Sequence, residues 1–181
     1  MGCDIHGHLE INWGRSKRWW HVCNIPDDRN YDLFGIFAGV RNYVNAIPIS
    51  ERKGIPDNSS YVVNYDLEKW TDDGHSYSWL TWKEIKEYDW DQKFIDGRIS
   101  TIDLSTGKET SKASYTHLQD ISEEEVREIG FELKYLERTA RDLIPFIWRG
   151  FFGFMRHLAE GDDEAKGYGE ENVRIVFWFD N

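Results

Sequence analysis

The sequence predicts an α+β fold with a mainly antiparallel sheet formed by both termini and helices packed on one face. Strand-like segments stand at both ends of the chain and helix-like segments lie between them, which is typical of this class. The chain has 181 residues, no internal repeat and no long linker, so we expect a single domain spanning 1–181. Hydrophobic residues make up 40% of it, enough for a packed core.

The terminal strands are predicted from their side-chain patterns. Residues 4–13 alternate between polar and apolar side chains, which is the period of a half-buried strand. Residues 18–23 are typical of a returning strand that completes a hairpin. At the other end, 173–179 is short and rich in β-branched and aromatic residues. The apolar members of the first strand are Ile5, Leu9, Ile11 and Trp13.

Helices are expected between these strands, at about 30–43, 62–70 and 81–87, and from 122 onward. Thr81 and Glu84 have the spacing of a capping box, which marks the start of a helix. Ser122 and Glu125 repeat that spacing and open a long helical region, which Pro145 divides or kinks. Its second half has an apolar stripe that we expect to face the core: Ile147, Phe151, Phe154, Met155 and Leu158.

Two segments have the composition of surface structure. Residues 44–60 contain Pro48, Gly54 and Pro56 and are expected to form an irregular loop. Residues 94–110 alternate weakly around a Ser-Thr-Gly-Lys turn and predict a second hairpin. Because that region is polar, we expect 94–120 to be peripheral.

Charge and cysteine content limit the partners and the compartment. The formal net charge is −11, which argues against a general nucleic-acid binder or an anionic-membrane binder, since both neutralise phosphate with cations. The two cysteines, Cys3 and Cys23, are too few for a disulfide framework and fit a reducing cytoplasm. No signal peptide or membrane span is apparent, so we expect a cytoplasmic protein.

Aromatic residues are unusually frequent, with nine Trp, nine Tyr and ten Phe. Most large rings fill protein cores, and that is the expected fate of most of these. Some could instead form a stacking platform for bases or sugars. There is no phosphate-binding glycine loop, dinucleotide-binding fingerprint or Gly-x-Ser-x-Gly elbow, so nucleotide kinases, dehydrogenases and α/β-hydrolases are not expected.

The first strand is the strongest candidate for a metal site. Asp4, His6, His8 and Glu10 follow a two-residue period and therefore project from the same face. Neighbouring members are about 6.5–7 Å apart, so two imidazoles could converge on one ion with a carboxylate completing the set. Imidazole with carboxylate suits a divalent metal such as Zn or Mn. The alternative is a solvent-facing polar strand with two incidental histidines.

A second cluster lies on a predicted glycine turn at 72–76. Asp73 is a candidate general base or orienting group, and His75 a candidate catalytic residue that could also hold the ion if it approaches the first strand. The alternative is a turn of the Asx type that precedes the helix at Thr81.

Arginines near the first predicted helix give a candidate phosphate site. Arg29 and Asn30 precede this helix, and Arg41 lies on its last turn. A guanidinium group is the preferred partner of phosphate, so we assign these three residues to substrate binding. A merely solvated helix face is the alternative.

Several motifs also occur together in this chain. They are Cys3-Asp4-Ile5-His6, Arg29-Asn30-Tyr31-Asp32-Leu33-Phe34, Val40-Arg41-Asn42, Asp73-Gly74-His75-Ser76 and the C-terminal Val176-Phe177-Trp178-Phe179-Asp180-Asn181. In this combination the sequence resembles a family of uncharacterised proteins met in bacteriophages and bacterial genomes. The resemblance covers both ends and the first half of the chain. It implies a small accessory role in the host cytoplasm, including interference with host immunity.

Three functions are consistent with these features. The first is a metal-dependent hydrolase of a phosphoester or nucleotide, in which the bound ion would generate the attacking hydroxide. The second is a non-enzymatic phage protein that binds or sequesters a host nucleotide signal, with aromatic faces stacking the bases. The third is a structural or interaction protein whose polar cluster is a hydrogen-bonded core network.

Overall fold

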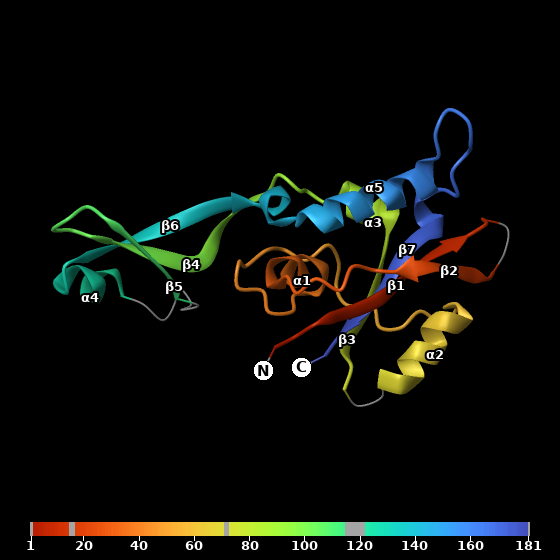
Figure 1. The fold of residues 1–181 in the computed structure, drawn as a ribbon, viewed down its shortest axis with the longest axis horizontal. Coiled ribbons are helices and arrows are strands. Elements are labelled where there is room, and N and C mark those ends of the chain that lie inside the picture. Colours follow the sequence, from red (N-terminus) through yellow and green to blue (C-terminus); the bar gives the residue numbers. More distant parts are fainter. Residues whose placement is uncertain (1, 15–16, 71–72, 115–121, 181) are drawn as a thin grey trace. The chain divides into compact units, whose positions relative to one another are not determined.

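A computed structural model describes residues 2–14, 17–70, 73–114 and 122–180, and it is α+β as the sequence predicts (Figure 1). Its residues divide into two compact units. Unit 1 contains Met1–Asn30, Pro48–Tyr88 and Ile144–Asn181, and unit 2 contains Tyr31–Ile47 and Asp89–Leu143. None of the helices within the described ranges is long and apolar enough to cross a membrane.

Unit 1 is built on a four-stranded antiparallel sheet that joins the two ends of the chain. Its strands are β1 (Ile5–Asn12), β2 (Trp19–Asn24), β3 (His75–Thr81) and β7 (Val173–Phe179). Their order is β2-β1-β7-β3, so the N-terminal and C-terminal strands are the two central ones. The sheet formed by both termini is therefore confirmed. Strand β3 was not predicted, because the Asp-Gly-His-Ser sequence that runs into its start resembles a turn.

The apolar face of this sheet forms the core of unit 1. Directly paired residues of neighbouring strands point to the same face, and Ile5 pairs with Phe179 while Leu9 pairs with Ile175. All four are buried. Helices α3 (Trp82–Glu87) and α5 (Phe146–Glu160) lie on one side of the sheet (Figure 1). A third helix, α2 (Tyr61–Trp70), lies on the other side and covers the second face.

The centre of the sheet requires glycine at position 7. Gly7 pairs with Phe177 of β7, and a Cβ atom added there would overlap the Val176 carbonyl oxygen and lie 2.9 Å from the Phe177 Cα. These are main-chain atoms of the neighbouring strand, so they cannot rotate away. The glycine between the two histidines thus has a structural cause in the close approach of β1 and β7.

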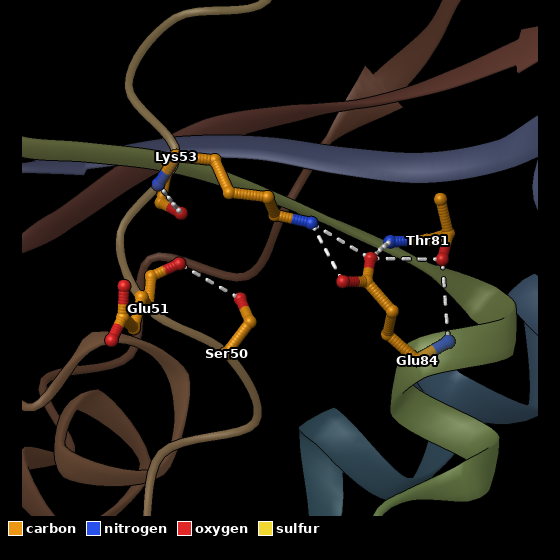
Figure 2. A network of polar contacts seen from close by, with 6 residues as sticks. Ser50, Glu51, Lys53, Thr81 and Glu84 are labelled. Carbon is orange, nitrogen blue, oxygen red and sulfur yellow. Dashed lines mark hydrogen bonds and ion pairs between the residues drawn. The ribbon is translucent and has the colours of Figure 1, made fainter.

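Helix α3 begins with the capping box that the sequence predicts. The Thr81 hydroxyl accepts a hydrogen bond from the Glu84 N–H, and the Glu84 carboxylate accepts one from the Thr81 N–H. Lys53 donates from Nζ to both oxygens of the same carboxylate, at 2.7 and 2.8 Å (Figure 2). This contact fastens the loop before α2 to the start of α3. The loop is fastened further where the Lys53 N–H donates to Ser78 Oγ.

Replacing Glu84 with glutamine is expected to destabilise the protein by about 2 kcal/mol at pH 7, because it weakens a charge-assisted cap and the contact with Lys53. Burial alone would raise the pKa of Glu84, but the bonds from Lys53 and Thr81 hold it below the ordinary 4.5. A lowered pKa in the folded state means that this stability is present above pH 4.5 and is lost as the pH falls through the folded pKa.

Urea unfolding of wild type and Glu84→Gln at pH 7 and at about pH 3 measures this effect. The difference between the two proteins should shrink at the lower pH. Glu87→Gln, an exposed change on the same helix, is the control and should cost little at either pH. A Glu84→Gln penalty that persists unchanged at low pH would contradict the assignment.

Helix α5 presents to the core a stripe that shares only Met155 with the one expected. The expected stripe included Ile147 and Phe154, but both are substantially exposed. The helix is apolar around much of its circumference, so two stripes were possible. The stripe containing Trp148 faces the core, and the buried residues are Trp148, Phe152, Met155 and Ala159.

Unit 2 contains a three-stranded antiparallel sheet in the order β5-β4-β6. Its elements are α1 (Tyr31–Ala38), β4 (Lys93–Asp103), β5 (Glu109–Ser114), α4 (Glu123–Glu128), β6 (Phe131–Thr139) and the 3-10 helix η2 (Ala140–Leu143). The hairpin expected after residue 94 is therefore present as β4 and β5. Helix α1 is shorter than predicted and ends before Gly39, which has a φ of 68°.

The prediction of a long helix after Ser122 is wrong. Ser122 does cap α4, but that helix ends after six residues, and Gly130 follows in a left-handed conformation with a φ of 88°. The chain then continues as β6, where apolar and charged residues alternate from Phe131 to Lys134 and pair with β4. The two-residue period after the glycine was the signal for a strand.

Candidate functional site

The second face of the unit 1 sheet has a layer of polar side chains. His6, His8 and Glu10 pair with Trp178, Val176 and Arg174 of β7, so all point to this face, as the two-residue period predicts. We expected the polar face of this strand to be open to solvent, but it is largely covered. His8 is 3% exposed and Glu10 is 0% exposed. We refer to five side chains as the polar layer: His6, His8, Glu10, His21 and Arg174.

Glu10 and Arg174 form a buried ion pair in this layer. Both Nε and Nη2 of Arg174 lie 2.8 Å from Glu10 Oε2. The second carboxylate oxygen, Oε1, accepts a hydrogen bond of 2.6 Å from the Ser60 N–H, and Ser60 in turn caps the start of α2. The Arg174 guanidinium also stacks 3.7 Å from the Trp19 ring. Burial lowers the pKa of Arg174, and the Glu10 charge opposes that shift. Both Glu10 oxygens are thus engaged in structural contacts.

Asp4 is also paired with an arginine, but this ion pair is much more exposed than that of Glu10. Nε and Nη2 of Arg29 each donate to one of its oxygens, both at 2.6 Å. The Arg29 bonds hold the pKa of Asp4 below its usual value. Asp4, which was predicted to bind a metal, and Arg29, which was predicted to bind phosphate, therefore bind each other.

Each histidine of β1 has a carboxylate partner. His6 Nε2 lies 3.3 Å from Asp180 Oδ2, and its ring stacks on Trp70 of α2 with centroids 4.1 Å apart. His8 Nε2 lies 3.2 Å from Asp66 Oδ2 of α2. Burial, assisted by the nearby His21, lowers the pKa of His8, so this imidazole is neutral at pH 7.

These two histidines open into a small polar pocket. Its volume is about 280 Å³, and its lining includes His6, His8, Asp27, Asp66 and Trp70. Imidazoles oriented by carboxylates are typical of both general bases and metal ligands. Among the described residues, however, no three His, Cys, Asp or Glu side chains are grouped so that they could hold a metal ion.

The predicted turn cluster lies elsewhere. His75 pairs with Phe179 and stacks on its ring at 6.1 Å, whereas Trp178, the next residue, pairs with His6. Successive residues of a strand alternate between faces, so His75 lies on the opposite face from His6. Asp73 donates its N–H to the Trp70 carbonyl in the turn after α2, and Asp72 lies outside the described residues.

The other two predicted binding residues occupy separate units. Asn30 is the last residue of its segment in unit 1, whereas Arg41 belongs to unit 2. There the Arg41 guanidinium lies 6.0 Å from the Tyr31 ring. The structure thus brings His6 and His8 to one pocket, but it does not gather the whole predicted set there.

A larger groove lies between β2 and the start of α2. Its volume is about 610 Å³. The two strongly exposed aromatic side chains in its lining are Trp20 (50%) and Tyr61 (81%). Lys17 and Arg18 contribute positive charge, and none of the described residues that line it is acidic. Its lining is Lys17, Arg18, Trp19, Trp20, His21, Asn58, Ser59, Ser60, Tyr61 and Val62.

Aromatic surface extends beyond this groove on both elements. Trp20 stacks with Trp13 at 6.0 Å, and Tyr61 stacks with Tyr65 at 6.1 Å. A neighbouring hollow of about 560 Å³ shares Trp19 and Asn58 with the groove, but its lining includes the acidic Asp57 and Glu171. The groove is therefore the hollow whose charge suits an anion.

Sequence reasoning missed several residues of both sites. Asp66, Asp180 and His21 are the partners of the β1 histidines, and each comes from another element. Asp180 stood in the C-terminal motif, but only the pairing of β1 with β7 brings it to His6. No protein-family model, no curated protein and no solved structure matches this chain.

Proposed function

We propose that the protein binds a nucleotide in the groove between β2 and α2 and holds it without turnover. The observation that carries this proposal is the charge of the groove. In a chain with a net charge of −11, the described lining of this hollow contains two cations, three Trp or Tyr side chains and no carboxylate. An aromatic ligand that carries phosphate is the chemical class that fits such a lining.

The groove has a contact for each part of a nucleotide. Trp20 and Tyr61 present ring faces on which a base can stack. Lys17 and Arg18 are placed for phosphate, and the Ser59 and Asn58 side chains offer hydrogen-bonding groups beside them. A volume of about 610 Å³ is within the usual range for small-molecule sites. Sequestration of a nucleotide signal would fit the small accessory role, including interference with host immunity, that the resemblance to phage and bacterial proteins implies.

Truncation of either ring is expected to weaken nucleotide binding. Trp20→Ala and Tyr61→Ala should each raise the Kd for ATP roughly 5- to 150-fold, because stacking on an aromatic ring contributes about 1–3 kcal/mol per base. Isothermal titration calorimetry with ATP, GTP, CTP, UTP and cyclic di-AMP measures the affinities. Adenosine and tripolyphosphate, titrated alone, separate the contributions of base and phosphate.

Tyr168→Ala is the control, because Tyr168 is an exposed tyrosine of unit 1 that does not line the groove. Its affinity should stay within about twofold of wild type. Failure of the wild-type protein to bind any of these nucleotides below 1 mM would overturn the proposal. Equal losses in Tyr61→Ala and Tyr168→Ala would do so as well.

Metal-dependent hydrolysis of a phosphoester is the second candidate, and the carboxylate-oriented histidines of the smaller pocket favour it. The fate of the nucleotide distinguishes the two functions. Bound nucleotide recovered intact after incubation with MnCl₂ or ZnCl₂ supports binding without turnover. Release of phosphate that is lost in His6→Ala supports hydrolysis.

A further inference from the structure

The groove between β2 and α2 shares a wall with the neighbouring hollow of about 560 Å³. Trp19 and Asn58 belong to the lining of both. Asn58 is exposed, so a ligand can extend from one hollow into the other across the surface of unit 1. Each volume alone is within the usual range for a small-molecule site, and a mononucleotide in the groove leaves the second hollow unfilled.

The two cations that line the second hollow already have carboxylate partners. Lys53 Nζ donates to both oxygens of Glu84 (Figure 2), and Arg174 Nε donates to Glu10 Oε2 at 2.8 Å. Neither positive charge is left to balance a bound anion. A phosphate is therefore not the group that suits this hollow, in contrast to the groove beside it.

The polar group that the second hollow offers to a ligand is a carboxylate. Asp57 is exposed, and its carboxylate makes no hydrogen bond or ion pair with the other residues that the structure describes. The second acid of the lining, Glu171, is bound to Lys83 at 2.6 Å. An ionised carboxylate only accepts hydrogen bonds, so the complementary ligand group is an N–H donor.

The remaining walls of the second hollow are aromatic and apolar. Trp19 and Trp79 line it together with Ile55, which is 45% exposed. A flat, uncharged ring that carries N–H donors suits such walls, and a nucleobase is a group of this kind. Guanine is the common base with two adjacent donors, N1–H and the N2 amino group, which one carboxylate accepts together.

We infer that the ligand is a dinucleotide, with one base in the groove and a guanine in the second hollow. This inference rests on the proposed function, because the first base is the one that stacks on Trp20 and Tyr61. The guanine packs beside Trp79 and donates to both oxygens of Asp57. The phosphate that links the two nucleosides then crosses the shared wall.

The shared wall has a hydrogen-bond donor for that linking phosphate. Arg174 Nη1 donates to Asn58 Oδ1 at 3.0 Å, which fixes the orientation of the amide. The Asn58 NH₂ group keeps its donors for a ligand that passes over it. An amide suits a phosphodiester because it binds the oxygens without requiring a second negative charge to be balanced.

Isothermal titration calorimetry of the wild type with the linear dinucleotides pGpG and pApA and with GDP tests this inference. GDP has a similar charge to pGpG but only one base. We expect the Kd for pGpG to be about tenfold or more below that for GDP, with a smaller gain for pApA. If GDP binds and pGpG binds no more tightly, the dinucleotide is wrong and the nucleotide groove stands. If neither binds below 1 mM, both proposals are overturned.

Asp57→Asn tests the guanine contact. It should raise the Kd for pGpG roughly tenfold and leave that for GDP within about twofold. Removing a negative charge would by itself strengthen phosphate binding, so a loss reports the base contact. Asp163→Asn is the matched control, since Asp163 is exposed and lines neither hollow. An unchanged Kd for pGpG in Asp57→Asn, or an equal loss in Asp163→Asn, would overturn the assignment of Asp57.

Discussion

Replacing Glu10 with glutamine is expected to lower the free energy of unfolding by about 3–5 kcal/mol, a large part of the stability of a domain this size. The change keeps the side-chain shape but leaves the Arg174 guanidinium buried without its counter-charge. Breaking one partner of a buried pair costs this much because the remaining charge has lost its hydration and gains nothing in return. Urea unfolding followed by tryptophan fluorescence measures the difference.

Two comparisons make this prediction specific. Asp4→Asn breaks the Asp4–Arg29 pair, which has similar geometry but a solvent-exposed arginine, and should cost roughly 0–1 kcal/mol. The double variant Glu10→Met with Arg174→Met removes both charges and should recover much of the loss. A Glu10→Gln penalty no larger than that of Asp4→Asn would mean that the pair is not buried as described.

Gly7→Ala is expected to destabilise the protein by about 3 kcal/mol, and it has the second largest expected effect. The added methyl group overlaps main-chain atoms of β7, so the two central strands must move apart and weaken their shared hydrogen bonds. His6 and His8 flank this residue and would be displaced with the strand. A lower Tm and a lower urea midpoint should therefore accompany any loss of metal or ligand binding.

Gly153→Ala provides a control of opposite sign. Gly153 lies inside α5, and a Cβ there would meet no atom within 4 Å. Alanine should raise stability by about 0.5–1 kcal/mol, because glycine is the poorer helix former. If both alanines shift the urea midpoint in the same direction, close approach of β1 and β7 is not the reason for Gly7.

The parts of the fold that local pattern determines were predictable. The Thr81–Glu84 box gave the start of α3, and alternation gave β1 with its polar and apolar faces. Residues of β6 were predicted to be helical because Ser122 has the spacing of a helix cap. The signals against a continuing helix were Gly130 and the two-residue period that follows it. In each of these segments the deciding interactions lie within a few residues, so the sequence alone contained the signal.

Only some residues of the candidate sites could be predicted from the sequence. His6 and His8 could be singled out because they share a strand and a face, but their partners Asp66 and Asp180 come from distant segments. Nothing in the local pattern of β1 shows that α2 covers its polar face or that Arg174 neutralises Glu10. The groove likewise depends on the packing of β2 beside α2, which no short-range spacing encodes.

Helix α2, which covers the polar layer, has a consequence for the native-state ensemble. Among the residues of α2 only Val63 is fully buried, so undocking this helix exposes little apolar surface. Trp178 and Val176 also face α2, but His6, His8, Glu10 and Arg174 beside them are polar and regain hydration when water enters. We therefore expect transient opening of α2 to cost less free energy than global unfolding. Such openings would expose His8 and Glu10 to solutes while the central strands stay paired.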